Sequence, residues 1–184
     1  MKMTGEKLLG APRARVWEAL NDAEVLARAI PGCEELIRVS DTELTARVAV
    51  RIGPVAAKFK GEVQLGDLDP PKSYTISGSG KGGAAGMASG SARVHLEEDG
   101  AATRLSYDVK AKVAGKIAQL GGRLIDATAK KLADEFFTNL AAEFGAEPST
   151  DEVPGTVSAT AGHPAFWVLA GLAIATIALG LLLF

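Results

Sequence analysis

The sequence predicts an α+β fold, in which a curved antiparallel sheet is covered by one long C-terminal helix, followed by a separate transmembrane helix. Runs of alternating apolar and polar residues, divided by turn residues, follow one another over residues 35–113 and are typical of half-buried strands. Over residues 115–144 the apolar positions recur every three or four residues, which indicates an amphipathic helix. The last 20 residues, Ala165–Phe184, contain neither a charged residue nor a proline.

The first expected strand covers Met3–Leu9, and two short helices follow it. Pro12 opens the first of these helices, because proline suits a helix's first turn. Asn21 or Asp22 is expected to cap the second, which ends at Pro31-Gly32. Further strands are expected at residues 35–39, 43–52, 55–65, 73–79, 85–97 and 102–113, with a turn at residues 67–71. One helix follows over residues 115–144, and Gly145 fits its C-terminal cap.

The charges lie almost entirely in the first 145 residues. All 20 Lys and Arg residues precede residue 146, and so do all but three of the 22 acidic residues. This region is therefore almost neutral and carries no electrostatic footprint for nucleic acid. With Cys33 as its one cysteine, the chain forms no internal disulfide, which fits a reducing compartment. We expect one domain at 1–145, a flexible linker at 146–164 and a membrane anchor at 165–184.

The C-terminal segment matches a bilayer in length. A helix of 20 residues at about 1.5 Å each spans about 30 Å, the thickness of the hydrocarbon core. The N-terminus lacks the apolar run of a signal peptide, so we expect a single-pass tail anchor in the cell membrane, with the domain in the cytoplasm. A buried core helix is the alternative. The large apolar side chains of the anchor are Phe166, Trp167, Leu169, Leu172, Ile174, Ile177, Leu179, Leu181, Leu182, Leu183 and Phe184.

The predicted helix changes character along its length. Its first half contains small residues such as Gly121, Gly122 and Ala127, whereas its second half contains Phe136 and Leu140. The second half should seal the core, and the first half should leave an apolar pocket opposite residues 86–88. Alternatively, the two glycines allow a close approach of a strand or mark a kink. The expected lining is Ile30, Pro31, Cys33, Phe59, Met87, Leu120, Gly121, Leu124, Ile125 and Thr128.

Few residues suggest catalysis or metal binding. The two histidines, His95 and His163, belong to no cluster with ligand spacing, so we expect no metal site. A Cys33–His95 nucleophile pair depends on the fold bringing the two residues together. The flanking lysines of Phe59, Lys58 and Lys60, are expected on a solvated strand face, with docking of a partner as the alternative.

Several local sequences resemble the CoxG family of carbon monoxide dehydrogenase subunits. The two most specific are Ala29-Ile30-Pro31-Gly32-Cys33-Glu34 and Gly115-Lys116-Ile117-Ala118-Gln119-Leu120-Gly121, the second followed by Arg123-Leu124-Ile125-Asp126. Weaker matches are Ile52-Gly53-Pro54-Val55, Phe59-Lys60-Gly61, Asp69-Pro70-Pro71 with Tyr74, Gly78-Ser79-Gly80-Lys81-Gly82 and Phe136-Phe137. The resemblance covers about residues 2–145 and implies the START-like, Bet v 1-like helix-grip fold.

The resemblance also implies a function without catalysis. Members of this family resemble recruiters of a molybdenum-containing CO dehydrogenase or related hydroxylase to the membrane. Their apolar cavity implies a lipid or a quinone, either menaquinone or ubiquinone, as the bound ligand, and electrons would then pass to the respiratory chain. Two alternatives remain at this point: an assembly factor for the dehydrogenase, and a cyclase- or hydrolase-like enzyme with His95 or Asp126 as its titratable group.

Overall fold

The computed structural model describes residues 2–145, so the predicted linker and membrane anchor lie outside the described residues. The elements follow in the order β1 (Lys2–Leu9), α1 (Arg13–Ala19), α2 (Ala23–Ala29), β2 (Cys33–Arg38), β3 (Glu43–Ile52), β4 (Val55–Asp69), β5 (Ser73–Lys81), β6 (Met87–Asp99), β7 (Ala102–Ala114) and α3 (Gly122–Gly145). Two short 3-10 turns, η1 (Gly83–Ala85) and η2 (Lys116–Leu120), precede β6 and α3.

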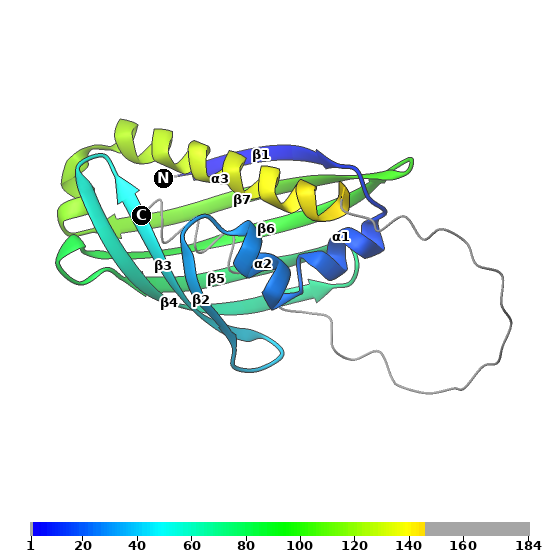
Figure 1. Ribbon diagram of the computed structural model, residues 1–184, viewed down its shortest axis with the longest axis horizontal. Helices are drawn as coiled ribbons and strands as arrows, with labels where there is room; N and C mark the ends of the chain where they lie inside the picture. Colours follow the sequence, from blue (N-terminus) through cyan, green and yellow to red (C-terminus); the bar gives the residue numbers. More distant parts are fainter. Residues whose placement is uncertain (1, 146–184) are drawn as a thin grey trace, which may run out of the picture.

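The seven strands form one antiparallel sheet in the order β1-β7-β6-β5-β4-β3-β2. Strand β1 pairs with the last strand, β7, so α1 and α2 carry the chain from one edge of the sheet to the other. Figure 1 shows α3 lying along one face of the curved sheet, with α1 and α2 near its C-terminal half. The predicted α+β architecture is therefore confirmed for the described residues.

The core lies between this concave face and α3. The predicted alternation in β3 is confirmed, because Leu44, Val48 and Ile52 are all buried. The second half of α3 buries Phe136 and Leu140 against the sheet. The predicted cap of α2 is also confirmed, since Asp22 Oδ1 accepts hydrogen bonds from the backbone N–H groups of residues 24 and 25.

Polar contacts hold the C-terminal half of α3 to its neighbours. The guanidinium of Arg28 in α2 donates two hydrogen bonds to the Glu143 carboxylate, at 3.0 and 2.7 Å. Asn139 Nδ2 donates to the carbonyl oxygen of Ala29 at 3.1 Å. Lys7 Nζ of β1 contacts Asp134 Oδ1 at 2.7 Å. Within residues 122–133, by contrast, the described side-chain hydrogen bonds and ion pairs stay inside the helix.

The prediction of one continuous helix over residues 115–144 was wrong at its start. Gly121 has φ of +87°, a left-handed conformation that ends η2 and separates it from α3. The break shifts the phase of the helix, so that Ile125 is buried while Leu124 is 37% exposed. The pattern of apolar residues in the sequence had placed Leu124 on the buried face. The alternative of a kink at the glycine pair describes this region better.

Several strand boundaries also differ from the predictions. Strand β2 begins at Cys33 rather than at residue 35, with an irregular register between Cys33 and Glu35. Strand β4 continues to Asp69 through a bulge after Gly66, so the predicted turn at residues 67–71 is shorter. Strand β6 begins at Met87 instead of residue 85, because residues 83–85 form a 3-10 turn.

Candidate functional site: a concave face lined by small residues

A row of small residues crosses the concave side of the sheet, close to the ends of β5 and β6 that η1 connects. The strand register aligns Ala46 with Gly61, Gly61 with Gly80, and Gly80 with Ala88. A second row pairs Gly78 with Gly90 and Gly90 with Ala111. We call these seven residues the glycine–alanine belt: Ala46, Gly61, Gly78, Gly80, Ala88, Gly90 and Ala111.

The belt faces the interior. Ala46, Ala88 and Ala111 are buried, and so are Gly61 and Gly80. The strands also lie close together here, since a Cβ on Gly90 would approach the Cβ of Ala111 to 2.7 Å. Small side chains at these positions permit the sheet to bend, and they leave the concave wall without bulky groups. The sequence carried a signal for this belt in its glycine-rich residues 78–90, but only the register showed that it crosses five strands.

The ten predicted pocket residues occupy three kinds of position. Ile30, Phe59 and Ile125 are buried, and Phe59 is fully enclosed at 0% exposure. Another four are half-buried: Pro31, Cys33, Leu120 and Thr128. The remaining three, Met87, Gly121 and Leu124, are exposed.

The exposed members lie at the rim of the concave face. In β6 the alternation turns Ala88 inward, whereas Met87 is 47% exposed, so we place Met87 at the rim rather than on the wall. Leu124 contacts the turn between β3 and β4, since a Cβ on Gly53 would lie 2.8 Å from its Cδ2 atom. Thr128, the one hydroxyl in the set, donates its hydrogen bond to the Leu124 carbonyl at 2.9 Å. Its donor is therefore engaged within the helix.

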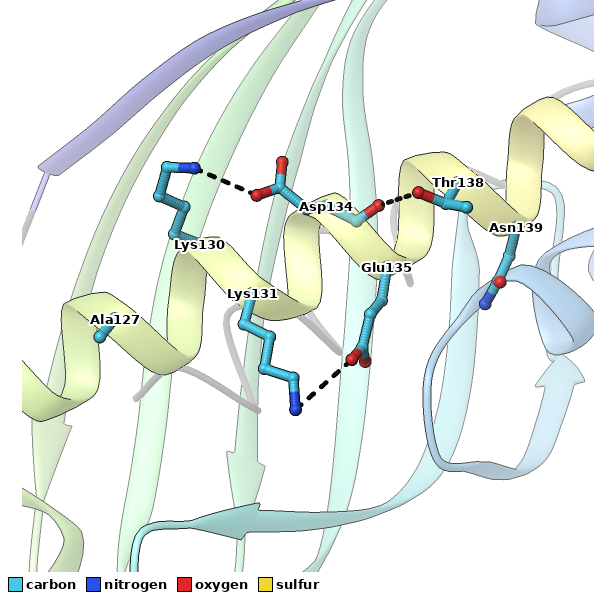
Figure 2. A pocket seen from close by; sticks show the side chains of 7 residues that line it. All are labelled: Ala127, Lys130, Lys131, Asp134, Glu135, Thr138 and Asn139. Atoms are coloured by element: carbon cyan, nitrogen blue, oxygen red, sulfur yellow. Dashed lines mark hydrogen bonds and ion pairs between the residues drawn. The ribbon is translucent and has the colours of Figure 1, made fainter.

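A surface hollow of about 560 Å³ lies on the outer side of α3. Figure 2 shows its lining of Ala127, Lys130, Lys131, Asp134, Glu135, Thr138 and Asn139. Its charged groups pair with one another along the helix, with Lys130 Nζ 3.1 Å from Asp134 Oδ2 and Lys131 Nζ 3.6 Å from Glu135 Oε1. This pairing is typical of a solvated helix face rather than of a binding site.

Two more hollows lie on the outer side of the sheet, behind the belt. One of about 480 Å³ reaches Ala46, Gly61 and Gly80. The other, of about 580 Å³, reaches Gly78, Gly90 and Ala111. Neither they nor the hollow on α3 is lined by any of the ten predicted residues. The predicted apolar pocket between α3 and the belt therefore stays a prediction.

The structure separates the titratable groups that the sequence singled out. Cys33 lies at a strand position paired with buried Val48, whereas His95 is on the outer side of β6 with Nε2 3.3 Å from Glu97 Oε1. Burial raises the pKa of the Cys33 thiol, so the group is a poor nucleophile at neutral pH. Asp126 is exposed on α3. A Cys33–His95 pair does not form.

Lys58 and Lys60 are exposed, as expected for a solvated strand face.

Among residues 2–145, no three His, Cys, Asp or Glu residues group together as metal ligands would. No helix there has both the length and the apolar character to cross a bilayer.

Comparison with known protein families identifies the family of this chain. A family model that describes CoxG, a subunit of carbon monoxide dehydrogenase, matches residues 5–145. The chain belongs to the CoxG family. The match covers β2 to β7, α3 and most of β1, so the belt and the rim both lie in the part that defines the family. A comparison with curated proteins gave no match.

Solved structures share the fold. A conserved protein from Geobacillus kaustophilus is 27% identical with a TM-score of 0.75, over 79% of this chain and 95% of that one. The Zhui aromatase/cyclase from Streptomyces sp. R1128 is 17% identical with a TM-score of 0.56, over 78% and 92%. Ara h 8.0201 is 16% identical with a TM-score of 0.58, over 80% and 99%. The CoxG domain therefore has the Bet v 1-like fold that the resemblance implied.

Proposed function

We propose that this CoxG-family chain is a non-catalytic accessory protein that holds a molybdenum-containing CO dehydrogenase-type enzyme at the membrane and supplies it with quinone. The observation that carries the proposal is the glycine–alanine belt beneath the first half of α3. Family membership over residues 5–145 supports the accessory role with a dehydrogenase. The similarity to an aromatase/cyclase is a similarity of fold, at 17% identity.

The chemistry of the concave face suits an apolar cargo. Small apolar residues form its wall, and bulky Phe136 and Leu140 fill its far end. A quinone has an apolar isoprenoid tail and a flat ring, which such a wall accommodates without a charged partner. The ring would lie near the rim, and the first half of α3 would cover the tail.

The two halves of α3 support a route for the cargo. Its C-terminal half is tied to α2 and β1 through Arg28–Glu143 and Lys7–Asp134. Its first half follows the break at Gly121 and meets the β3–β4 turn through Leu124. Fewer contacts must break for the first half of α3 to move than for the second half, so we place the entrance for the quinone at the first half.

A tethered position would serve this transfer. Quinone resides in the bilayer, and the apolar segment Ala165–Phe184 would keep the domain close to it. The 19 residues at 146–164 would allow an end-to-end distance of about 20–25 Å as a flexible chain. The same domain could then meet both the membrane and the enzyme.

Deleting the gene in its host tests the function. The dehydrogenase should remain active with an artificial electron acceptor but lose its coupling to respiration. An enzyme that is inactive with every acceptor would instead indicate the assembly factor that the sequence left open. Separately, removal of residues 165–184 should release the dehydrogenase from the membrane fraction, and an unchanged distribution would contradict the tether.

A further inference from the structure

Two exposed large apolar side chains, Met87 and Leu124, lie at one end of the domain. Among the described residues, Met87 and Leu124 are two of five large apolar side chains that are exposed. Figure 1 shows that the β3–β4 turn, the β5–β6 connection and the start of α3 all lie at this end. Contact between Gly53 and Leu124 joins the turn to the helix. Pro54 is exposed beside them, and Leu120 is half-buried.

Four basic residues lie on the elements that meet at this end. Arg51 is the penultimate residue of β3, Lys81 ends β5, and Lys116 and Arg123 lie on either side of the break at Gly121; all four are exposed. None of the four forms an ion pair with another residue in the described range 2–145. We call this surface the basic tip, consisting of Arg51, Pro54, Lys81, Met87, Lys116, Leu120, Arg123 and Leu124.

The opposite end of the sheet carries acidic residues. Strand β6 ends there with Glu97, Glu98 and Asp99, and β4 ends at Asp69. Three of these carboxylates are already engaged: Glu97 with His95 at 3.3 Å, Glu98 with Arg13 at 2.9 Å and Asp99 with Arg104 at 2.6 Å. The whole chain has a net charge of only −2, and its acidic end is largely paired, whereas the four basic residues of the basic tip are not. A negatively charged surface would therefore orient the domain with the basic tip toward it.

We propose that the basic tip docks on the surface of an anionic lipid bilayer, with Met87 and Leu124 entering the interface. Exposed apolar side chains and unpaired cations at the same end match the two attractions that such a surface offers, which are burial of apolar groups and a negative potential. A protein partner would need shape complementarity over a broad patch, whereas the described apolar surface here is small. Docking in this way would turn the contact between Gly53 and Leu124 toward the bilayer.

The length of chain that follows α3 is compatible with this orientation. With 24 residues at about 1.5 Å each, α3 carries the chain about 36 Å away from the tip. Residues 146–164, 19 in number, reach at most about 63 Å at 3.3 Å per residue, so they can return to the same bilayer. The docking inference relies on the proposed function only for this tether.

A position-sensitive label tests the docking. The full chain carries Cys33→Ala and either Met87→Cys or, at the opposite end, Ala101→Cys, each labelled with an environment-sensitive fluorophore. It is mixed with phosphatidylcholine vesicles or with vesicles containing about one third phosphatidylglycerol. Only the label at position 87 should shift to shorter wavelength and be quenched by spin-labelled lipid, and only in the anionic vesicles.

Charge variants separate docking from tethering. Lys116→Gln with Arg123→Gln should lower the docked-to-undocked ratio about 30-fold, because each basic group near an anionic surface contributes about a factor of five. The matched control, Lys72→Gln with Arg93→Gln, removes the same charge elsewhere and should leave the ratio unchanged.

A chain that floats with the vesicles while the label at position 87 stays in water overturns docking and leaves the tether intact. Failure to float overturns both. Shielding of position 87 only by added dehydrogenase also overturns docking, in favour of a protein partner.

Discussion

Tyr74 is the residue whose environment contrasts most with its chemistry. Its side chain is 1% exposed, packs edge-on against the Trp17 ring at 5.2 Å, and leaves its hydroxyl without a hydrogen-bond partner in the described range. Burial raises the pKa of this phenol well above its ordinary value. The hydroxyl is therefore neutral at physiological pH and carries an uncompensated loss of hydration.

Tyr74→Phe should raise the free energy of unfolding by about 1 kcal/mol, because it removes a buried polar group that has no partner. Urea unfolding of the full chain measures the change. Tyr107→Phe is the control, since that side chain is only half-buried, and its effect should stay within about 0.5 kcal/mol. A loss of stability in Tyr74→Phe would show that the hydroxyl has a bonding partner.

The sequence located Phe59 and Ile125 in the interior but placed Met87 and Leu124 beside them. Local periodicity is sufficient for Phe59, which follows the alternation of β4. The other three depend on breaks: Gly86, with φ of +122°, precedes Met87 in β6, and Gly121, with φ of +87°, precedes Leu124 and Ile125 in α3. Each break changes which residues of the following element face inward. The apolar pattern before the break therefore does not predict which residues are buried after it.

At the scale of elements, Asp134 joins α3 to the edge of the sheet. Its carboxylate lies 2.7 Å from Lys7 Nζ of β1 and 3.1 Å from Lys130 Nζ of the same helix. Hydrogen bonds from Lys7 and then Lys130 lower the pKa of Asp134 below its ordinary value. A carboxyl group with a lowered folded pKa stabilises the fold above its unfolded pKa and loses that contribution as the pH falls through the folded value.

Asp134→Asn should therefore reduce stability at neutral pH by less than about 1 kcal/mol, because the pair is partly exposed to solvent. As the pH falls through the lowered pKa of Asp134, the difference from the unaltered chain should diminish, since the folded carboxylate then becomes protonated. Unfolding in urea at neutral and at acid pH measures it. A difference that persists unchanged in acid would mean that Asp134 contributes by packing and not by charge.

The order of the elements was predictable, whereas the arrangement of the concave face was not. Alternation in Glu43–Ile52 gives a strand that the structure reproduces with the same bounds. The glycine–alanine belt arises from pairing between residues on different strands, such as Ala46 with Gly61 and Gly90 with Ala111. Such pairing is decided by register over the whole sheet, and one strand read alone does not reveal it.

At the scale of the whole molecule, the two proposals together place one end of the domain at the bilayer and the other at the linker. Residues 146–164 must then cover the length of α3, about 36 Å. Deleting residues 150–159 leaves nine linker residues, which extend to about 30 Å at most. We expect this variant to remain in the membrane fraction but to lose coupling between the dehydrogenase and respiration.

The control for that deletion replaces residues 150–159 with ten Gly and Ser residues, which keeps the length and changes the sequence. Coupling should persist in the replaced chain, and oxygen consumption by host membranes reports it. If the shortened chain couples as well as the unaltered one, the linker has no required reach and the tip need not face the bilayer.

The proposed function depends above all on quinone occupying the space between the belt and α3. Mass spectrometry of quinone extracted from the full chain, purified from host membranes, measures this occupancy. We predict close to one quinone per chain, its loss in Gly61→Leu, which fills the belt, and its retention in Gly66→Leu, where the added side chain meets open space. Thermal unfolding of each variant verifies that it is folded. A folded, unaltered chain that carries no quinone and takes none up from quinone-containing vesicles would contradict the proposed function.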